Sequence, residues 1–314
     1  MVFPRSLLIA ASTLFLAFPT EAVPGSPELQ SILKNTHKSP AYSYPTDFTR
    51  GILPIPVHSH NDYWRDVPFY TALSHGCISV EADVWLYNGT LFVGHDQSSL
   101  TDERTFESLY VNPILEVVER QNPESKFLTE ETKNGVFDAS TGQTLYLFVD
   151  SKTSGPETFE AVIAALEPLR EKGYLTTLKG NETLIEGPVT VIGTGNTPYD
   201  MVGPVADREY FYDGPLATLD EGGITALISP IASTSFTSAI GELSMKDADS
   251  VLSNKQLSTL RSQISVAKEK GILARYWGAP AYPIRARNLL WATLLSEGVG
   301  LLNADDLAAA AEYF

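Results

Sequence analysis

The stretch Leu53-Pro54-Ile55-Pro56-Val57-His58-Ser59-His60-Asn61-Asp62 passes from an apolar segment directly into histidines, an amide and a carboxylate. The same change recurs at Glu81-Ala82-Asp83, inside residues 78–85, and at His95-Asp96, after an apolar run ending at residue 93. Short apolar runs predict buried strands, so each polar group is expected near the carboxyl end of a strand. Barrel enzymes carry their catalytic residues at that end.

Strands and helices are expected to alternate along the rest of the chain. The expected strands are residues 53–57, 78–85, 145–149, 189–192, a weak one near Tyr210, 226–228, 272–276 and 299–302, and residues 87–93 form a hairpin arm turning at Asn88-Gly89. The expected helices are residues 67–74, 105–120, 157–172, 254–270 and 284–296. This rhythm predicts an α/β fold, a (β/α)8 TIM barrel. A doubly wound open sheet is the alternative, but no Gly-x-Gly-x-x-Gly fingerprint follows the first strand.

Three regions are predicted from the distribution of polarity. Residues 1–22 have the form of a signal peptide, with a basic start, an apolar centre and small residues before Val23. Residues 23–50 form a polar leader, and residues 51–314 a single barrel domain. The apolar centre is shorter than the ~20 residues that span a bilayer, which disfavours an uncleaved anchor. Secretion is therefore expected, and the sequons Asn88-Gly89-Thr90 and Asn181-Glu182-Thr183 fit a secreted glycoprotein.

Charge and cysteine content limit the partners of the protein. The net charge of −16 is opposite to what binding to a nucleic-acid backbone requires. A small zwitterionic or singly charged phosphodiester is compatible with such a surface. Cys77 is the single cysteine, so no disulfide forms within the chain, and its apolar neighbours predict a buried thiol.

The carboxylates predict a site for a hard cation. Glu81 and Asp83 lie two residues apart and therefore point to the same side of their strand. Asp150, which follows the apolar strand 145–149, provides a third oxygen ligand. Such a set suits Mg²⁺ or Ca²⁺. Lys152, two residues further on, is expected to reach a phosphate oxygen.

The histidines predict acid–base chemistry. All 5 histidines lie before residue 96. Zinc amidohydrolases recruit histidines from later strands, and here there are none, so that class is excluded. We expect His60 and His95 to act as general acid and base, with His58 as an orienting neighbour and Asp96 as a support for the loop or the imidazole. His58 stays an alternative to His60 as the catalytic histidine of the first strand.

These motifs resemble the phospholipase-C-like phosphodiesterase superfamily, and within it the fungal family named for altered inheritance of mitochondria. The similarity lies in His58-Ser59-His60-Asn61-Asp62-Tyr63, residues 79–84 and residues 91–96, and it extends over residues 53–307. It implies a barrel that cleaves phosphodiesters, with a metal on Glu81, Asp83 and Asp150 and a histidine pair. It also implies that Lys152 assists, that Trp277 and Asn61 contact the substrate, and that Asp305 caps or positions a loop.

The expected function is that of a secreted, metal-dependent phosphoric diester hydrolase acting on a glycerophosphodiester or phospholipid headgroup. Its substrate would be a small phosphodiester or a lysophospholipid-like molecule, reached with transient contact to a membrane surface. Two alternatives remain: a silent barrel that binds phospholipid or phosphate, and a glycoside hydrolase using Glu130 or Glu131. The second gives the histidine pair no role.

Overall fold

The computed structural model describes residues 44–244 and 250–314, together with residues 27, 29, 31, 32, 34, 39 and 41. Pro45–Phe314 forms one compact unit and Met1–Tyr44 is assigned to another. The predicted signal peptide, residues 1–22, lies outside the described residues. Thr49 falls within the predicted leader, yet its buried hydroxyl accepts a hydrogen bond from Nε2 of Gln121 at 2.7 Å.

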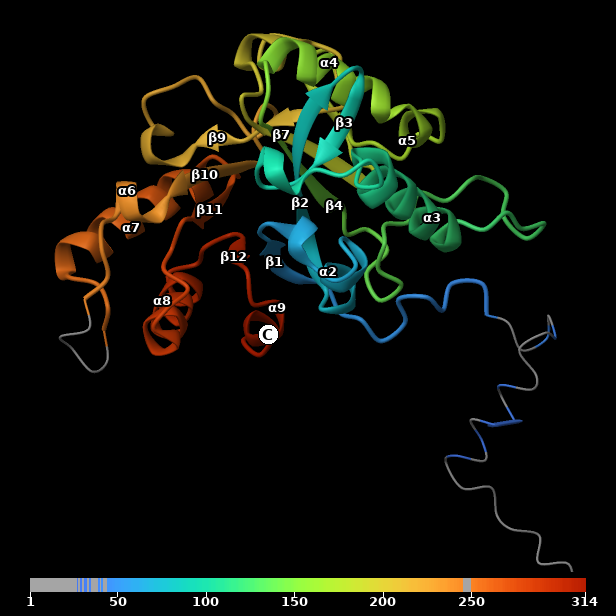
Figure 1. The fold of residues 1–314 in the computed structure, drawn as a ribbon, viewed down its shortest axis with the longest axis horizontal. Helices are drawn as coiled ribbons and strands as arrows, with labels where there is room; N and C mark the ends of the chain where they lie inside the picture. The colour runs from blue at the N-terminus through green and yellow to red at the C-terminus, as the bar shows by residue number, and fades with distance from the viewer. Residues whose placement is uncertain are drawn as a thin grey trace, which may run out of the picture. The chain divides into compact units, whose positions relative to one another are not determined.

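The larger sheet is parallel except for one hairpin strand, and its strands come mainly from the N-terminal part of the unit (Figure 1). Its strand order is β12 (Leu302–Ala304), β1 (Ile55–Ser59), β2 (Cys77–Tyr87), β4 (Leu145–Ser151), β7 (Val189–Gly195) and β8 (Phe211–Tyr212). β3 (Thr90–Val93) pairs antiparallel with β2 and forms the predicted hairpin. A second sheet holds β9 (Gly214–Pro215), β10 (Ile231–Ser235) and β11 (Leu273–Trp277).

Helices follow most strands and lie outside the sheets in Figure 1. The longer ones are α3 (Asn112–Gln121), α4 (Gly155–Ala165), α7 (Asn254–Glu269) and α8 (Ile284–Ser296). The short ones are α2 (Tyr70–Ser74), α5 (Glu167–Glu171), α6 (Phe236–Ala239), α9 (Leu307–Ala311), the π-helix η4 (Glu107–Val111) and the 3₁₀ turns η2 (Asp62–Trp64), η3 (Gln97–Ser99), η5 (Tyr199–Met201) and η6 (Leu216–Thr218). Their apolar faces and the strands share one buried core, which confirms the mixed α/β class with a parallel sheet.

Several element predictions are corrected by the structure. Residues 226–228 form a turn, and the strand lies at β10, because three consecutive apolar residues do not distinguish a strand from a packed turn. The last strand, β12, begins at Leu302 rather than at residue 299. The predicted helix 157–172 is divided into α4 and α5, and a hairpin of β5 (Thr177–Lys179) and β6 (Thr183–Ile185) was not predicted.

Two further features concern burial. Cys77 is fully buried, as predicted, and burial raises the pKa of its thiol to about 12. Within the part of the chain that the structure describes, no helix is long and apolar enough to cross a membrane.

Candidate active site

A cavity of about 360 Å³ lies at the carboxyl ends of β1, β2, β4, β7 and β11. Of the residues that we predicted for catalysis, metal binding and substrate contact, it brings together all except His58. The lining residues are His60, Asn61, Glu81, Asp83, His95, Asp150, Lys152, Thr194, Gly195, Arg275 and Trp277.

Three carboxylates meet on one side of this cavity. Glu81 and Asp83 lie two residues apart on β2, so their side chains point to the same face. The strand register places Asp83 directly beside Asp150 of β4. One oxygen from each of the three carboxylates lies within 4.8 Å of the others. The backbone N–H of Asn61 donates to Oε2 of Glu81 at 2.8 Å and holds that carboxylate in place.

The lysine lies within this cluster. Nζ of Lys152 is 2.7 Å from Oδ2 of Asp150 and 3.0 Å from Oδ2 of Asp83. Burial opposes the charge of Lys152, but the two carboxylates outweigh it and raise the pKa of its ammonium. Burial and the charge of Glu81 raise the pKa of Asp83 to about 7, against the opposing effect of Lys152. The cluster therefore holds more negative charge than Lys152 neutralises.

His60 follows β1 and is held by residues at both ends of the chain. Its Nδ1 lies 2.8 Å from Oδ1 of Asp305 and 3.1 Å from Nδ2 of Asn61. Its Nε2 is 3.9 Å from Oε2 of Glu81, beside the carboxylate cluster. The imidazole is thus fixed at one nitrogen and faces the carboxylates with the other.

His95 lies beside Asp83 and is half exposed. Its Nδ1 is 3.0 Å from the hydroxyl of Tyr63 and 3.8 Å from Oδ2 of Asp83. The indole of Trp64 covers one side of the ring, with 5.1 Å between ring centroids. The two histidines therefore flank the carboxylates that were predicted to hold a metal.

His58 is fully buried beneath the cavity. Its Nδ1 lies 2.7 Å from the hydroxyl of Ser79, and its ring packs edge-on against Phe148. Burial and the nearby Arg275 lower the pKa of His58 to about 3, so its imidazole is neutral at physiological pH. This placement suits an orienting neighbour of Glu81, whose Oε2 is 3.7 Å from Nε2.

Tyr63 and Arg275 belong to the site but were not predicted from the sequence. The Tyr63 hydroxyl lies 2.7 Å from Oδ2 of Asp83 as well as contacting His95. Arg275 is buried, with Nε donating to Asn303 at 3.0 Å and Nη2 lying 3.6 Å from Oε1 of Glu81. A charged residue within the apolar strand 272–276 was the available signal for Arg275.

Two local backbone features shape the cavity. Asn61 adopts the left-handed conformation, with φ 49° and ψ 43°, which turns the chain sharply after β1 into η2. Gly195 also has a positive φ, 64°, and a Cβ placed on it would lie 1.9 Å from Oδ1 of Asp150. A glycine is therefore required where the chain passes the third carboxylate.

The loops around the cavity account for the remaining predicted residues. Trp277 ends β11, lines the cavity and is 44% exposed. Asp96 accepts from the backbone N–H of Ser98 and caps η3, so it supports the loop after His95. The resemblance implied that Asp305 caps or positions a loop; in the structure the neighbouring Asp306 caps α9, and Asp305 contacts His60.

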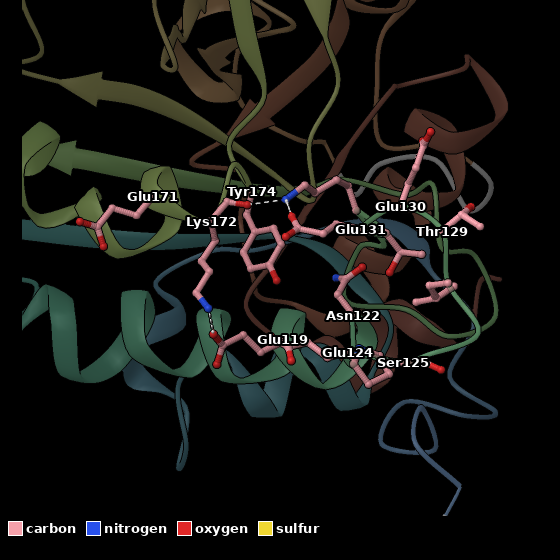
Figure 2. Close-up of a pocket in the computed structure, with 14 residues that line it drawn as sticks. Glu119, Asn122, Glu124, Ser125, Thr129, Glu130, Glu131, Glu171, Lys172 and Tyr174 are labelled. Carbon is pink, nitrogen blue, oxygen red and sulfur yellow. Dashed lines mark hydrogen bonds and ion pairs between the residues drawn. The ribbon is translucent and has the colours of Figure 1, made fainter.

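The carboxylates considered for a glycosidase lie elsewhere. Glu130 and Glu131 line a separate pocket of about 540 Å³, at the carboxyl ends of α3 and α5. Figure 2 shows the Glu130 side chain directed away from Glu131, which lies 3.4 Å from Nζ of Lys133. The histidine pair is not part of this pocket.

The donor set of the main cavity fits a hard divalent cation. Oxygen atoms from Glu81, Asp83 and Asp150 converge, which is the ligand type that Mg²⁺ and Ca²⁺ prefer. Burial and the charges of Glu81 and Asp150 raise the pKa of Asp83, and a bound cation would relieve the repulsion between these carboxylates.

Comparison with known proteins places the chain in a family. Residues 46–213 match the model of the AIM6-like phosphodiesterase domain. The chain is 55% identical over 313 residues to altered inheritance of mitochondria protein 6 homolog of Arthroderma benhamiae, covering 98% of this chain and 99% of that protein. It is 34% identical over 305 residues to altered inheritance of mitochondria protein 6 of Zygosaccharomyces rouxii, covering 88% and 73% respectively. The chain therefore belongs to the altered inheritance of mitochondria protein 6 family.

Proposed function

We propose that this protein is a metal-dependent phosphoric diester hydrolase acting on a glycerophosphodiester or a phospholipid headgroup. The observation that carries the proposal is the cavity in which two histidines flank three carboxylates and a lysine. The match to a phosphodiesterase domain model supports the same reaction class. All the side chains that the proposed reaction requires line this one cavity.

Glu81, Asp83 and Asp150 would hold the cation, Mg²⁺ or Ca²⁺, which would offset negative charge developing on the phosphate. His60 and His95 exchange protons with the attacking and leaving oxygen atoms, one as base and the other as acid. Lys152 interacts with a nonbridging phosphate oxygen as a point charge. His58, beneath the cavity, and Arg275, in its lining, hold Glu81 in position.

The attacking group is water or a hydroxyl of the substrate. A neighbouring hydroxyl would give a cyclic phosphate, because an intramolecular nucleophile has a high effective concentration. Trp277 and Asn61 are the substrate contacts that we propose, since both line the cavity. The net charge of −16 favours a zwitterionic or singly charged diester over a polyanion.

The two sheets are proposed to be the wall of one (β/α)8 barrel. Only Asp213 separates β8 from β9 along the chain, and Arg275 pairs with Leu301 in a parallel bridge next to β12. With these links, the strand order β1, β2, β4, β7, β8–β9, β10, β11 and β12 returns to β1. All the site residues would then lie at the carboxyl-terminal mouth.

Secretion and contact with a membrane surface complete the proposal. Asn88 and Asn181, the sequon asparagines, are exposed in hairpin turns with positive φ, where a glycan has room. The exposed aromatic residues near the cavity are Trp64 in η2, Trp277 at the end of β11 and Tyr282 in the loop after it. Such amphipathic side chains favour the membrane interface.

Hydrolysis of bis-p-nitrophenyl phosphate and glycerophosphocholine tests the function. We expect His60→Ala and His95→Ala to lose about 10²- to 10⁴-fold in kcat/KM, the usual contribution of general acid–base catalysis. His75→Ala, in the turn before β2, is the matched control and keeps the wild-type rate. If neither diester is turned over, but both bind, the binding-protein alternative replaces the hydrolase.

A further inference from the structure

The hydroxyl of Tyr63 has three close neighbours. It lies 2.5 Å from Oδ1 of Asn61, 2.7 Å from Oδ2 of Asp83 and 3.0 Å from Nδ1 of His95. The ring of Tyr63 is buried, so water does not compete for these contacts. A phenol carries one hydrogen and can donate only one hydrogen bond.

The hydrogen of Tyr63 is directed at an oxygen atom. Both oxygen neighbours are closer than His95, and two acceptors at such distances without a hydrogen between them would repel each other. If Asp83 is ionised, the two oxygen atoms compete for the hydrogen. If Asp83 is protonated, it donates to Tyr63, which then donates to Asn61. With the Asn61 amide reversed, Asn61 donates and the tyrosine hydrogen goes to Asp83.

With Asp83 as a carboxylate, His95 therefore faces a lone pair of Tyr63 whichever way the Asn61 amide is turned; only a protonated Asp83 together with a reversed amide would turn the tyrosine hydrogen towards His95. Opposite the carboxylate form of Asp83, Nδ1 of His95 forms the 3.0 Å hydrogen bond as the donor. A neutral imidazole has one N–H, so a hydrogen on Nδ1 leaves Nε2 as the nitrogen with a free lone pair.

His60 is also held at its Nδ1 atom, by the carboxylate of Asp305. Nδ1 of His60 lies 2.8 Å from Oδ1 of Asp305. Burial disfavours the charge of Asp305, but its contact with His60 and the charge of Arg65 hold its pKa below the usual range, so it is an acceptor. His60 also carries its hydrogen on Nδ1, and the Asn61 amide is then turned so that its oxygen, not its nitrogen, is the atom 3.1 Å from Nδ1.

We propose that Tyr63 is a positioning residue that fixes neutral His95 as the Nδ1–H tautomer, so that Nε2 exchanges the proton with the substrate. His60 and His95 then present the same nitrogen to the cavity, one held by a carboxylate and the other by a phenol. Only the final step, proton exchange with a phosphodiester, rests on the proposed function. The tautomer itself is a property of the protein without substrate.

Nitrogen-15 NMR of the histidine side chains in the purified protein tests this. Spectra are recorded at pH ~8.5, about two units above the ordinary histidine pKa, and the tautomer is read from the signals of the neutral form. The signals are assigned with His→Gln variants. We expect both His60 and His95 to carry hydrogen on Nδ1, whereas free histidine in the same buffer favours Nε2–H. A wild-type His95 with hydrogen on Nε2 would overturn the proposal whether or not any variant folds.

Tyr63→Phe removes the hydroxyl and keeps the ring. We expect His95 to shift towards the Nε2–H tautomer while His60, held by Asp305, keeps Nδ1–H and reports an intact site. Tyr110→Phe is the matched control, since the buried Tyr110 hydroxyl donates to the backbone oxygen of Glu81 and the variant should leave His95 unchanged. An unchanged His95 tautomer in folded Tyr63→Phe would overturn the proposal.

Kinetics separate this inference from the function. If the protein hydrolyses diesters, Tyr63→Phe should lower kcat by about 10- to 100-fold, the usual effect of removing a residue that orients an active-site ligand, with KM little changed. A protein with the expected tautomers and no turnover of any diester would retain the inference and lose the proposed function.

Discussion

Nδ1 of His60 and Oδ1 of Asp305 lie 2.8 Å apart although 245 residues separate them in the sequence. The contact forms because β1 pairs with β12, which places His58 beside Asn303 and Ser59 beside Ala304. The first and last strands of the domain together therefore position one half of the proposed acid–base pair.

Asp305 and Asp306 are adjacent, but Asp305 contacts His60 whereas Asp306 caps α9. Replacing Asp305 with Ala should lower kcat by about 10- to 100-fold, because His60 loses the group that orients it. Asp306→Ala should keep kcat and lower the free energy of unfolding by about 1 kcal/mol, since Asp306 caps α9 and lies 2.8 Å from Arg287. Steady-state kinetics measure kcat, and urea unfolding measures the free energy of unfolding, for both variants. Equal kinetic losses would argue against the orienting role.

Gly195→Ala should disrupt the carboxylate cluster. The new methyl group would collide with Oδ1 of Asp150, and we expect at least a 10-fold loss of Mg²⁺ affinity by isothermal titration calorimetry. Gly180→Ala is the control, because Gly180 has a similar positive φ, 59°, and open space around it. Both variants should lose about 1 kcal/mol of stability to the left-handed backbone, so a matching loss of affinity in both would contradict the steric explanation.

Trp277→Ala tests the proposed substrate contact. Trp277 lines the cavity, and among the described residues no side-chain hydrogen bond joins its indole to a carboxylate or a histidine. We expect KM for glycerophosphocholine to rise several-fold with little change in kcat, the pattern for a contact made equally in the ground and transition states. Phe127→Ala, which removes an 84% exposed aromatic residue outside the cavity, should leave both constants unchanged.

Asp62 gives a prediction for pH. Burial raises its pKa from 3.8 to about 6, against hydrogen bonds from Ser59 and Phe69. Between pH 4 and pH 6 the folded chain therefore retains a proton that the unfolded chain has released, and stability falls as the pH rises. Relative to Asp62→Asn, the wild type should lose up to about 3 kcal/mol across this window, at 1.36 kcal/mol per pKa unit. Urea unfolding at several pH values measures the difference, and a constant difference would contradict the raised pKa.

The sequence predicted that Glu81 and Asp83 point to the same side, because alternation along a strand requires no knowledge of other strands. Asp150 joins them as expected because the parallel register of β2 and β4 brings it beside Asp83. The structure also brings His60 and His95 to the same cavity.

What could not be predicted depends on contacts between distant segments. Arg275 lies on β11 and its partner Glu81 on β2, while Asp305 follows β12 and its partner His60 follows β1. Tyr63 follows the first motif, but its significance depends on where Asp83 and His95 lie in space. Glycine is required at position 195 because the Asp150 carboxylate lies where a Cβ atom would be.

The most direct test of the central claim is to titrate Mg²⁺, and separately Ca²⁺, into protein stripped of metal with EDTA, while following hydrolysis of bis-p-nitrophenyl phosphate. We predict no turnover without metal and saturable activation by one of these cations in the wild type, with no activation of Asp150→Asn. Hydrolysis at the full rate in EDTA, or activation of Asp150→Asn equal to that of the wild type, would contradict a reaction that depends on a cation at this cluster.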